Sequence, residues 1–256
     1  MGIWIFRIPH AKSSMVILTA AALLAFLSEP SYNGIAILII SYLLFLFTFD
    51  YLFENSNRPF RLNYVLTILV DLAPVIAALL FYGLRVVLSL APSAILVLIY
   101  VILSSKRLGR STVALAVGSA ILSGFYLYFC SIIGPLSFSE IMIGVMLVMY
   151  TVSQVIYVES RMAFRRISPY IPAALTLMIV VPAVLLPIYF LVPIIEPVVK
   201  TVHAIFDLKK ISEYKMIERL GRTEAIKYAF FLLLMSVSVV LMHDHSIYLW
   251  LFLCHA

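Results

Sequence analysis

The chain has 256 residues, of which 64% are hydrophobic and only 12% are charged, and its mean hydropathy is +1.12. These fractions lie far from those of soluble domains, and the long apolar runs lack the polar faces that a water-exposed helix or strand requires. The composition therefore excludes a soluble globular domain. Its net charge of +6 has to lie mainly at the membrane edges, because buried charge is costly.

The apolar runs predict an all-α fold, a polytopic transmembrane helical bundle that forms one domain over residues 1–256. A hydrocarbon core about 30 Å thick is crossed by roughly 20 helical residues, and on that scale the chain divides into about nine spans. The spans are expected at residues 13–28, 32–49, 63–82, 86–104, 112–131, 140–158, 169–185, 186–202 and 224–242. Prolines interrupt the seventh and eighth spans, so a re-entrant pair is the alternative there.

Basic residues predict the sidedness of the bundle. If the N-terminus is cytoplasmic and each span crosses once, all the Lys and Arg side chains except Arg85 fall on the cytoplasmic side. Such segregation follows the positive-inside rule. We therefore expect a multi-pass protein of the cell membrane with its N-terminus inside.

The longest loop, 200–227, carries many of these basic residues. Within it, Ser212 is expected to cap a short helix that Gly221 ends, with Glu218 and Arg222 paired one turn apart. The last span is then expected to begin as a separate helix three residues after Gly221.

Charged residues follow the second span, at its cytoplasmic end. Asp50 and Glu54 are four residues apart, so on a continuing helix they share one face and can bind a divalent cation such as Mg²⁺. Arg58 and Arg61 can bind an anionic group beside it. This pattern fits a diphosphate, and an interfacial helix end with local Glu–Arg pairing is the alternative.

A second basic segment follows the sixth span. Glu159 is a further candidate metal ligand, and Arg161, Arg165 and Arg166 are candidates for binding an anion. His10, at the entrance of the first span, is added to the anion-binding set. Ordinary cytoplasmic basic residues are the alternative explanation for this segment.

Two acids lie within or at the edge of apolar segments beside prolines. Asp71 precedes Pro74 in the third span, and Glu196 lies beside Pro197 in the eighth. Intramembrane acids face the bundle interior and often mark a transport pathway or a proton relay. Structural hydrogen bonding of Asp71 and a helix-end position of Glu196 are the alternatives.

Three short segments resemble the YwiC-like membrane proteins. They are Ile8-Pro9-His10-Ala11-Lys12-Ser13-Ser14-Met15, the segment from Gln154 to Arg166, and Leu220-Gly221-Arg222-Thr223-Glu224-Ala225. That family has a Pro/His motif at the first span, a basic segment at a span end and a Gly-x-x-Glu before the last span. The resemblance implies a multi-pass membrane protein and no particular activity.

The architecture also resembles UbiA-type prenyltransferases, which have about nine helices and acidic motifs in the cytoplasmic loops after spans two and six. In that family the motifs bind the magnesium diphosphate of an isoprenoid donor. Here Asp50, Glu54 and Arg58-Pro59 occupy the first place, and Glu159 alone the second. The resemblance implies a related pocket, with prenyl transfer as the reaction if the protein is an enzyme.

Two functions and a scaffold role follow as hypotheses. The first is a pocket that binds an isoprenoid diphosphate or lipid headgroup at the cytoplasmic face, with Mg²⁺ as cofactor. The second is a permease for a small solute or ion that uses Asp71 and Glu196. The third is a non-catalytic subunit of a membrane complex. Membrane lipids are expected partners in each case, and nucleic acid is not.

Overall fold

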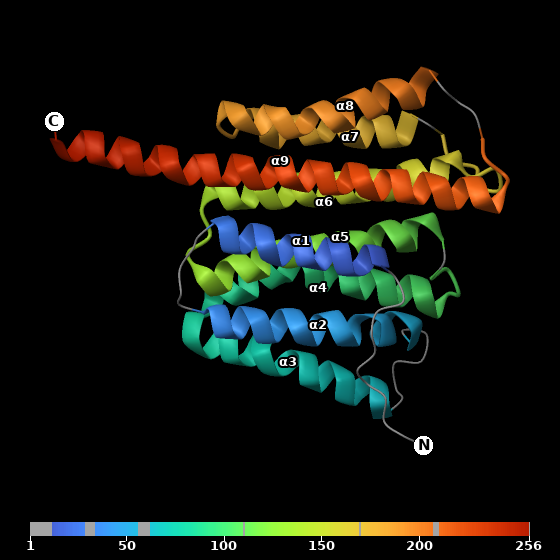
Figure 1. Ribbon diagram of the computed structural model, residues 1–256. Helices are drawn as coiled ribbons and strands as arrows, with labels where there is room; N and C mark the ends of the chain where they lie inside the picture. Colours follow the sequence, from blue (N-terminus) through green and yellow to red (C-terminus); the bar gives the residue numbers. More distant parts are fainter. Residues whose placement is uncertain are drawn as a thin grey trace. The chain divides into compact units, whose positions relative to one another are not determined.

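In a computed structural model of the protein (Figure 1), the structure describes residues 12–28, 34–55, 62–109, 111–168, 170–206 and 210–255, without the side chains of 12, 13, 50, 54, 203, 204, 214 and 243–255. The described residues form α-helices, one short 3-10 helix and no sheet. The helices are α1 (Lys12–Ser28), α2 (Ile35–Asn55), α3 (Leu62–Tyr82), α4 (Leu84–Ser105), α5 (Thr112–Ile133), α6 (Phe138–Arg161), α7 (Tyr170–Val184), η1 (Ile188–Phe190), α8 (Leu191–Phe206) and α9 (Tyr214–His255). The all-α prediction is confirmed for this part of the chain.

The chain divides into two compact units, Met1–Ser137 and Phe138–Ala256. In the first unit α5 is the central helix and packs against α1, α2, α3 and α4. Its apolar stretch is 72% buried, whereas that of α4 is only 17% buried. The difference identifies α5 as the core of the unit and α4 as a peripheral helix.

Small residues and hydroxyl groups explain how α5 packs on four neighbours. At Gly118 an added Cβ would lie 2.9 Å from the ring of Phe53, so a larger residue would require that ring to shift. The Tyr128 hydroxyl lies 3.0 Å from that of Ser41 on α2, and Ser89 on α4 donates a 2.9 Å hydrogen bond to Ser131. Small residues and interhelical hydroxyl bonds hold helices together where the hydrophobic effect between them is weak.

The second unit contains α6, α7, η1, α8 and α9. Contacts run from α6 to α7, from α7 to α8, from α8 to α9 and from α9 back to α6, which makes a four-helix arrangement. The 3-10 turn η1 joins α7 to α8, with Pro187 just before it. Figure 1 shows α7 and α8 running side by side.

Helix α9 corrects one prediction. Residues 214–255 form one continuous helix of 42 residues, so Gly221 does not end a short helix and the last helix does not begin after it. Gly221 does not adopt the left-handed backbone conformation that closes a helix. No proline follows it, and strong helix formers surround it. The predicted pair within this segment is confirmed, since Arg222 lies 2.7 Å from Glu218.

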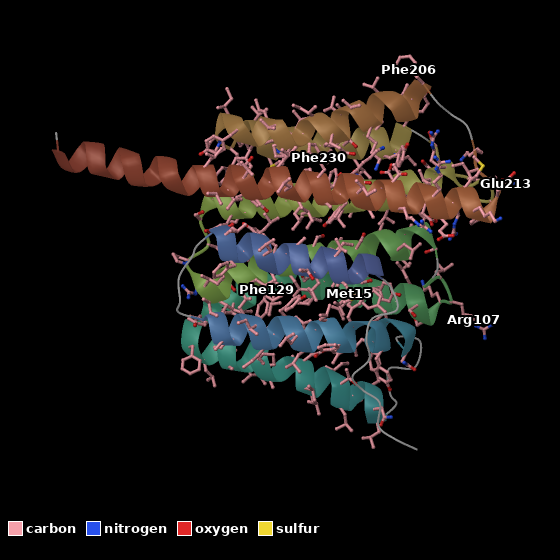
Figure 2. All side chains as sticks on the ribbon, viewed as in Figure 1. Met15, Arg107, Phe129, Phe206, Glu213 and Phe230 are labelled. Atoms are coloured by element: carbon pink, nitrogen blue, oxygen red, sulfur yellow. The ribbon has the colours of Figure 1, made fainter. Side chains whose placement is uncertain are left out.

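Five of the described helices are long and apolar enough to cross a membrane, namely α3, α4, α5, α6 and the part of α9 from Lys215 to Met242. The segments Ser14–Ser28, Ile35–Phe49 and Tyr170–Val184 are shorter apolar helices. Large apolar side chains are exposed along α3, α4, α7 and α8, and Figure 2 shows Phe206 pointing away from its helix. In each unit, exposed apolar side chains of this kind fit a surface that faces lipid.

Candidate functional site

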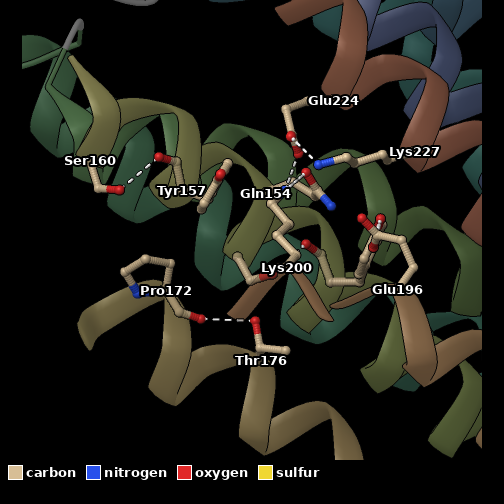
Figure 3. A network of polar contacts seen from close by, with 11 residues as sticks. Gln154, Tyr157, Ser160, Pro172, Thr176, Glu196, Lys200, Glu224 and Lys227 are labelled. Atoms are coloured by element: carbon tan, nitrogen blue, oxygen red, sulfur yellow. Dashed lines mark hydrogen bonds and ion pairs between the residues drawn. The ribbon is translucent and has the colours of Figure 1, made fainter. Parts of the chain in front are cut away.

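A cluster of ionisable side chains lies inside the second unit, between α6, α8 and α9. Helix α6 contributes Tyr150, Gln154 and Tyr157, which lie on one face because their spacing is four and three residues. Helix α8 contributes Glu196 and Lys200, also four apart. Helix α9 contributes Glu224, Lys227, Tyr228 and Phe231, which share one face by the same three- and four-residue spacing. Polar faces of three helices thus meet in one place, as Figure 3 shows.

Lys200 is the centre of this ionisable cluster. Its ammonium group donates hydrogen bonds to Gln154 Oε1 and Glu224 Oε2, and it lies 4.2 Å from the centroid of the Tyr157 ring. The side chains of Lys200 and Glu224 are each only 6% exposed. A lysine so deeply buried requires a partner charge, because an isolated ammonium group is costly to transfer out of water.

Two further charges complete the cluster. Lys227 Nζ lies 3.0 Å from Glu224 Oε1, so Glu224 is shared between two lysines. Glu196 Oε2 accepts a 2.6 Å hydrogen bond from the Tyr150 hydroxyl. Two ammonium and two carboxylate groups give a formal net charge of zero, which lowers the cost of burying Lys200 and Glu224 beside the half-buried Glu196 and Lys227.

Aromatic rings form the apolar side of the cluster. Tyr150 stacks on Phe231 with ring centroids 3.7 Å apart, and on Tyr228 at 5.7 Å. The Tyr228 hydroxyl lies 3.3 Å from that of Thr151. This stacking joins α6 to α9 and holds the Tyr150 hydroxyl toward Glu196.

Three buried polar atoms of the cluster have no hydrogen-bond partner among the described residues: Gln154 Nε2, Glu196 Oε1 and Thr201 Oγ1. Because an ammonium group can only donate, Gln154 must present its oxygen to Lys200 and turn its amide nitrogen away. Lys200, Thr201 and Tyr157 border a recess with about 180 Å³ between its atoms, including space open to solvent. Unused polar groups beside a recess can exchange partners, whereas fully bonded groups cannot.

In the first unit, the predicted transport acid Asp71 is buried on α3. Its two carboxyl oxygens each lie 2.9 Å from the hydroxyl of Thr48 on α2. Asp71 and Glu196 therefore belong to different units, and each has its own surroundings. Asp71 is thus a hydrogen-bonded acid, and Glu196 lies within α8 rather than at its end. A transport role of either acid stays a prediction.

The predicted arginine site at the end of α6 contains residues with different environments. Arg161 is buried and lies 5.7 Å from the centroid of the Tyr157 ring. Arg165 forms an ion pair with Glu159, with 2.8 Å between Nε and Oε2. Arg166 is exposed. Glu159 is thus engaged by an arginine, which is the local pairing that competes with metal binding.

The C-terminal end of α6 is capped by a segment far along the chain. Lys210 Nζ donates a 2.6 Å hydrogen bond to the carbonyl of Ser160. The Ile211 amide donates to the Arg161 carbonyl at 2.8 Å. A cation suits this end of a helix, where carbonyl groups lack helical partners. Lys210 therefore acts as a structural cap for α6.

The remaining predicted site residues lie outside the described part of the chain. His10, Arg58 and Arg61 are not described, and neither are the side chains of Asp50 and Glu54. The Mg²⁺ site and its diphosphate therefore stay predictions. Among the described residues no group of three His, Cys, Asp or Glu side chains is arranged to hold a metal ion.

No family model, curated protein or solved structure matches this chain. The resemblances to the YwiC-like proteins and to UbiA-type prenyltransferases therefore stay predictions that rest on short sequence segments and on architecture.

Sequence reasoning found Glu196 but did not identify Lys200, Glu224 and Gln154 as site residues. Lys200 was grouped with the cytoplasmic basic residues, since it lies at the end of an apolar segment. One signal was available: Glu196 and Lys200 are four residues apart, and so share a face of an otherwise apolar helix. The ion-pair partner of Lys200, Glu224, lies 24 residues beyond it on α9, and no sequence periodicity relates the two.

Proposed function

We propose that the protein is a multi-pass permease of the cell membrane for a small ion or solute, and that the ionisable cluster of Glu196, Lys200, Glu224 and Lys227 is its proton-coupling site. The observation that carries the proposal is the Lys200–Glu224 ion pair, buried between α8 and α9 within an apolar bundle. Ionisable groups in such places are rare, and they commonly mark ion pathways and proton relays.

The shapes of α7 and α8 support this proposal. They have 15 and 16 residues, which corresponds to about 22–24 Å of helix and falls short of the roughly 30 Å hydrocarbon core. Both contain proline, and a 3-10 turn joins them. Short, interrupted helices beside a buried polar site are typical of transporters, whose substrate sites lie near the membrane centre.

The division of the cluster among three helices also supports it. Glu224 holds Lys200 from α9, whereas Gln154 and Tyr150 hold α8 from α6. A shift of α8 therefore requires Lys200 or Glu196 to exchange partners. Such an exchange of partners is the kind of bistable element that alternating access requires.

The closed packing of the recesses favours a proton or a small ion over an isoprenoid. Neither the recess beside Lys200 nor the one in the first unit, lined by Met15, Leu46 and Phe49, has room for a water molecule between its atoms. A pocket for an ordinary small molecule holds about 300 Å³ or more, and a prenyl chain requires such room.

The proposal includes a membrane topology with the basic loops in the cytoplasm. Nine crossings with a cytoplasmic N-terminus, or seven if α7 and α8 form a re-entrant pair, put the same basic loops on the cytoplasmic side. On either path Lys200 belongs to a segment that enters the membrane from that side. The coupling site then communicates with the cytoplasm near the basic segments that flank α6 and α9.

The test is a flux assay on purified protein in liposomes that contain a pH-sensitive dye. Sodium, potassium, ammonium, inorganic phosphate, succinate and alanine are added outside in turn, with and without an imposed potassium diffusion potential. We expect at least one solute to cause a protein-dependent change of internal pH. The double variant Lys200→Met/Glu224→Gln, which removes both charges of the pair, should abolish it.

The matched control is Glu218→Gln, which removes one charge from the exposed pair on the same helix. Its pH response should equal that of the wild type. Absence of any protein-dependent pH change across the whole series would overturn the proposal. A wild-type response in the double variant would overturn the assignment of the cluster.

A further inference from the structure

The buried Asp71–Thr48 contact contains more acceptors than protons. Thr48 Oγ1 lies 2.9 Å from Asp71 Oδ1, 2.9 Å from Asp71 Oδ2 and 2.7 Å from the Leu44 carbonyl oxygen. All three neighbours are acceptors if the carboxyl group is ionised, and a threonine hydroxyl has one proton to donate. One hydroxyl proton cannot make three good hydrogen bonds of this length.

A second proton resolves the geometry. If Asp71 is a carboxylic acid, its O–H donates to Thr48 Oγ1, and the hydroxyl of Thr48 is then free to donate to the Leu44 carbonyl at 2.7 Å. Each oxygen in this chain then has a role that its chemistry permits. If Asp71 is ionised, the single hydroxyl proton of Thr48 can serve only one side. Either the Thr48 hydroxyl oxygen and the Leu44 carbonyl oxygen lie 2.7 Å apart with no proton between them, or Asp71 receives no hydrogen bond.

The helices packed around Asp71 offer, among their described side chains, no cation to hold a carboxylate. Helix α3 carries Asp71 as its only charged residue, and α5 carries none. On α4 the one charged residue is Arg85, at the far end of α3 from Asp71 and roughly 20 Å away along the helices. Helix α2 carries the acids Asp50 and Glu54, whose side chains are not described.

The titratable tyrosines of the packed helices do not replace a cation either, since a phenol is neutral. Among the described residues, Tyr128 on α5 bonds Ser41, and Thr67, one turn before Asp71, donates to its own helix at the Asn63 carbonyl. A buried carboxylate with a single hydroxyl neighbour is among the costliest groups in a protein interior, and protonation removes that cost.

From this geometry we propose that Asp71 is a proton-binding site of the first unit, occupied by a proton at neutral pH and closed by Thr48. The ligand is a proton exchanged with water, and the site is independent of the ionisable cluster of the second unit. Pro74 lies one turn beyond Asp71 and is also buried. It leaves the Val70 carbonyl without its helical hydrogen bond, so α3 is weakest where the proton is held.

Infrared spectroscopy on the protein in lipid tests the proposal, because a protonated carboxyl group and a carboxylate absorb in separate regions. At neutral pH the wild type should show a protonated-carboxyl band that shifts in D₂O and is lost in Asp71→Asn. Thr48→Val should keep the band and shift it to higher frequency, since the acid loses its hydrogen-bond acceptor. Asp71→Asn is expected to fold, because its amide N–H₂ donates to Thr48 as the acid does.

Glu140→Gln is the control, since Glu140 is a buried acid of the other unit; it should leave the Asp71 band unchanged. Loss of carboxylate absorption in Asp71→Asn, with the protonated region equal to the wild type, would overturn the proposal. If Asp71→Asn does not fold, an unshifted protonated-carboxyl region in Thr48→Val overturns it. The result does not depend on transport, so it can fail while the proposed permease function stands.

Discussion

Asp71 in the first unit and Glu224 in the second are both buried carboxyl groups on apolar helices, but their partners differ. Asp71 has one hydroxyl neighbour, Thr48. Glu224 has two lysines, Lys200 from α8 and Lys227 from its own helix. An apolar interior can accept an acid either as a neutral group or as half of an ion pair. The choice decides which substitutions are tolerated.

The largest effect is expected for breaking the ion pair. Glu224→Gln alone should lower the free energy of unfolding by about 3–5 kcal/mol, because it leaves the buried Lys200 without its paired carboxylate. Lys200→Met alone should lower it by less, because Glu224 keeps its ion pair with Lys227. The double variant should recover most of that loss. Denaturation of the purified protein in detergent measures all three. A double variant that is less stable than both single variants would contradict the pairing.

Removing a hydroxyl that binds a charged group should have the next largest effect. Tyr150→Phe keeps the stacking on Phe231 but leaves Glu196 without its donor, so a loss of about 1.5–3 kcal/mol is expected. Tyr128→Phe is the matched variant in the first unit, where the partner is the neutral hydroxyl of Ser41. It should lose only about 0.6 kcal/mol, typical of hydrogen bonds between membrane helices. Equal losses in the same unfolding assay would argue against a charged Glu196.

Thr48→Val tests whether Asp71 is buried as a neutral acid or as a carboxylate. If Asp71 is neutral, loss of the hydroxyl removes one ordinary hydrogen bond and should cost about 1 kcal/mol. If Asp71 is ionised, the substitution removes the only described donor to a buried charge. A destabilisation as large as that of Glu224→Gln, measured by the same denaturation, would show that both units bury charged acids.

The smallest effect is expected at the exposed ion pair of α9. Glu218 and Arg222 are one turn apart, with exposed fractions of 51% and 78%. Glu218→Gln should change the free energy of unfolding by less than about 0.5 kcal/mol, because water screens exposed pairs. A loss of several kcal/mol would mean that this turn of α9 is buried against another surface.

Much of the helical framework was predictable from the sequence. Apolar runs of about 20 residues have few alternatives to a helix when lipid surrounds them, since every backbone polar group must bond within its own segment. The wrong prediction was the break at Gly221, within α9. Glycine permits the conformation that ends a helix but does not impose it, so packing and the following residues decide.

The sequence by itself determined that this protein is helical and apolar, and it singled out Asp71 and Glu196 as acids in unusual places. Only the tertiary structure decided what those acids contact. Thr48 lies 23 residues before Asp71, and Glu224 lies 24 residues after Lys200. Composition and periodicity describe one helix at a time, whereas these partners belong to neighbouring helices whose rotation and register depend on the packing of the whole unit.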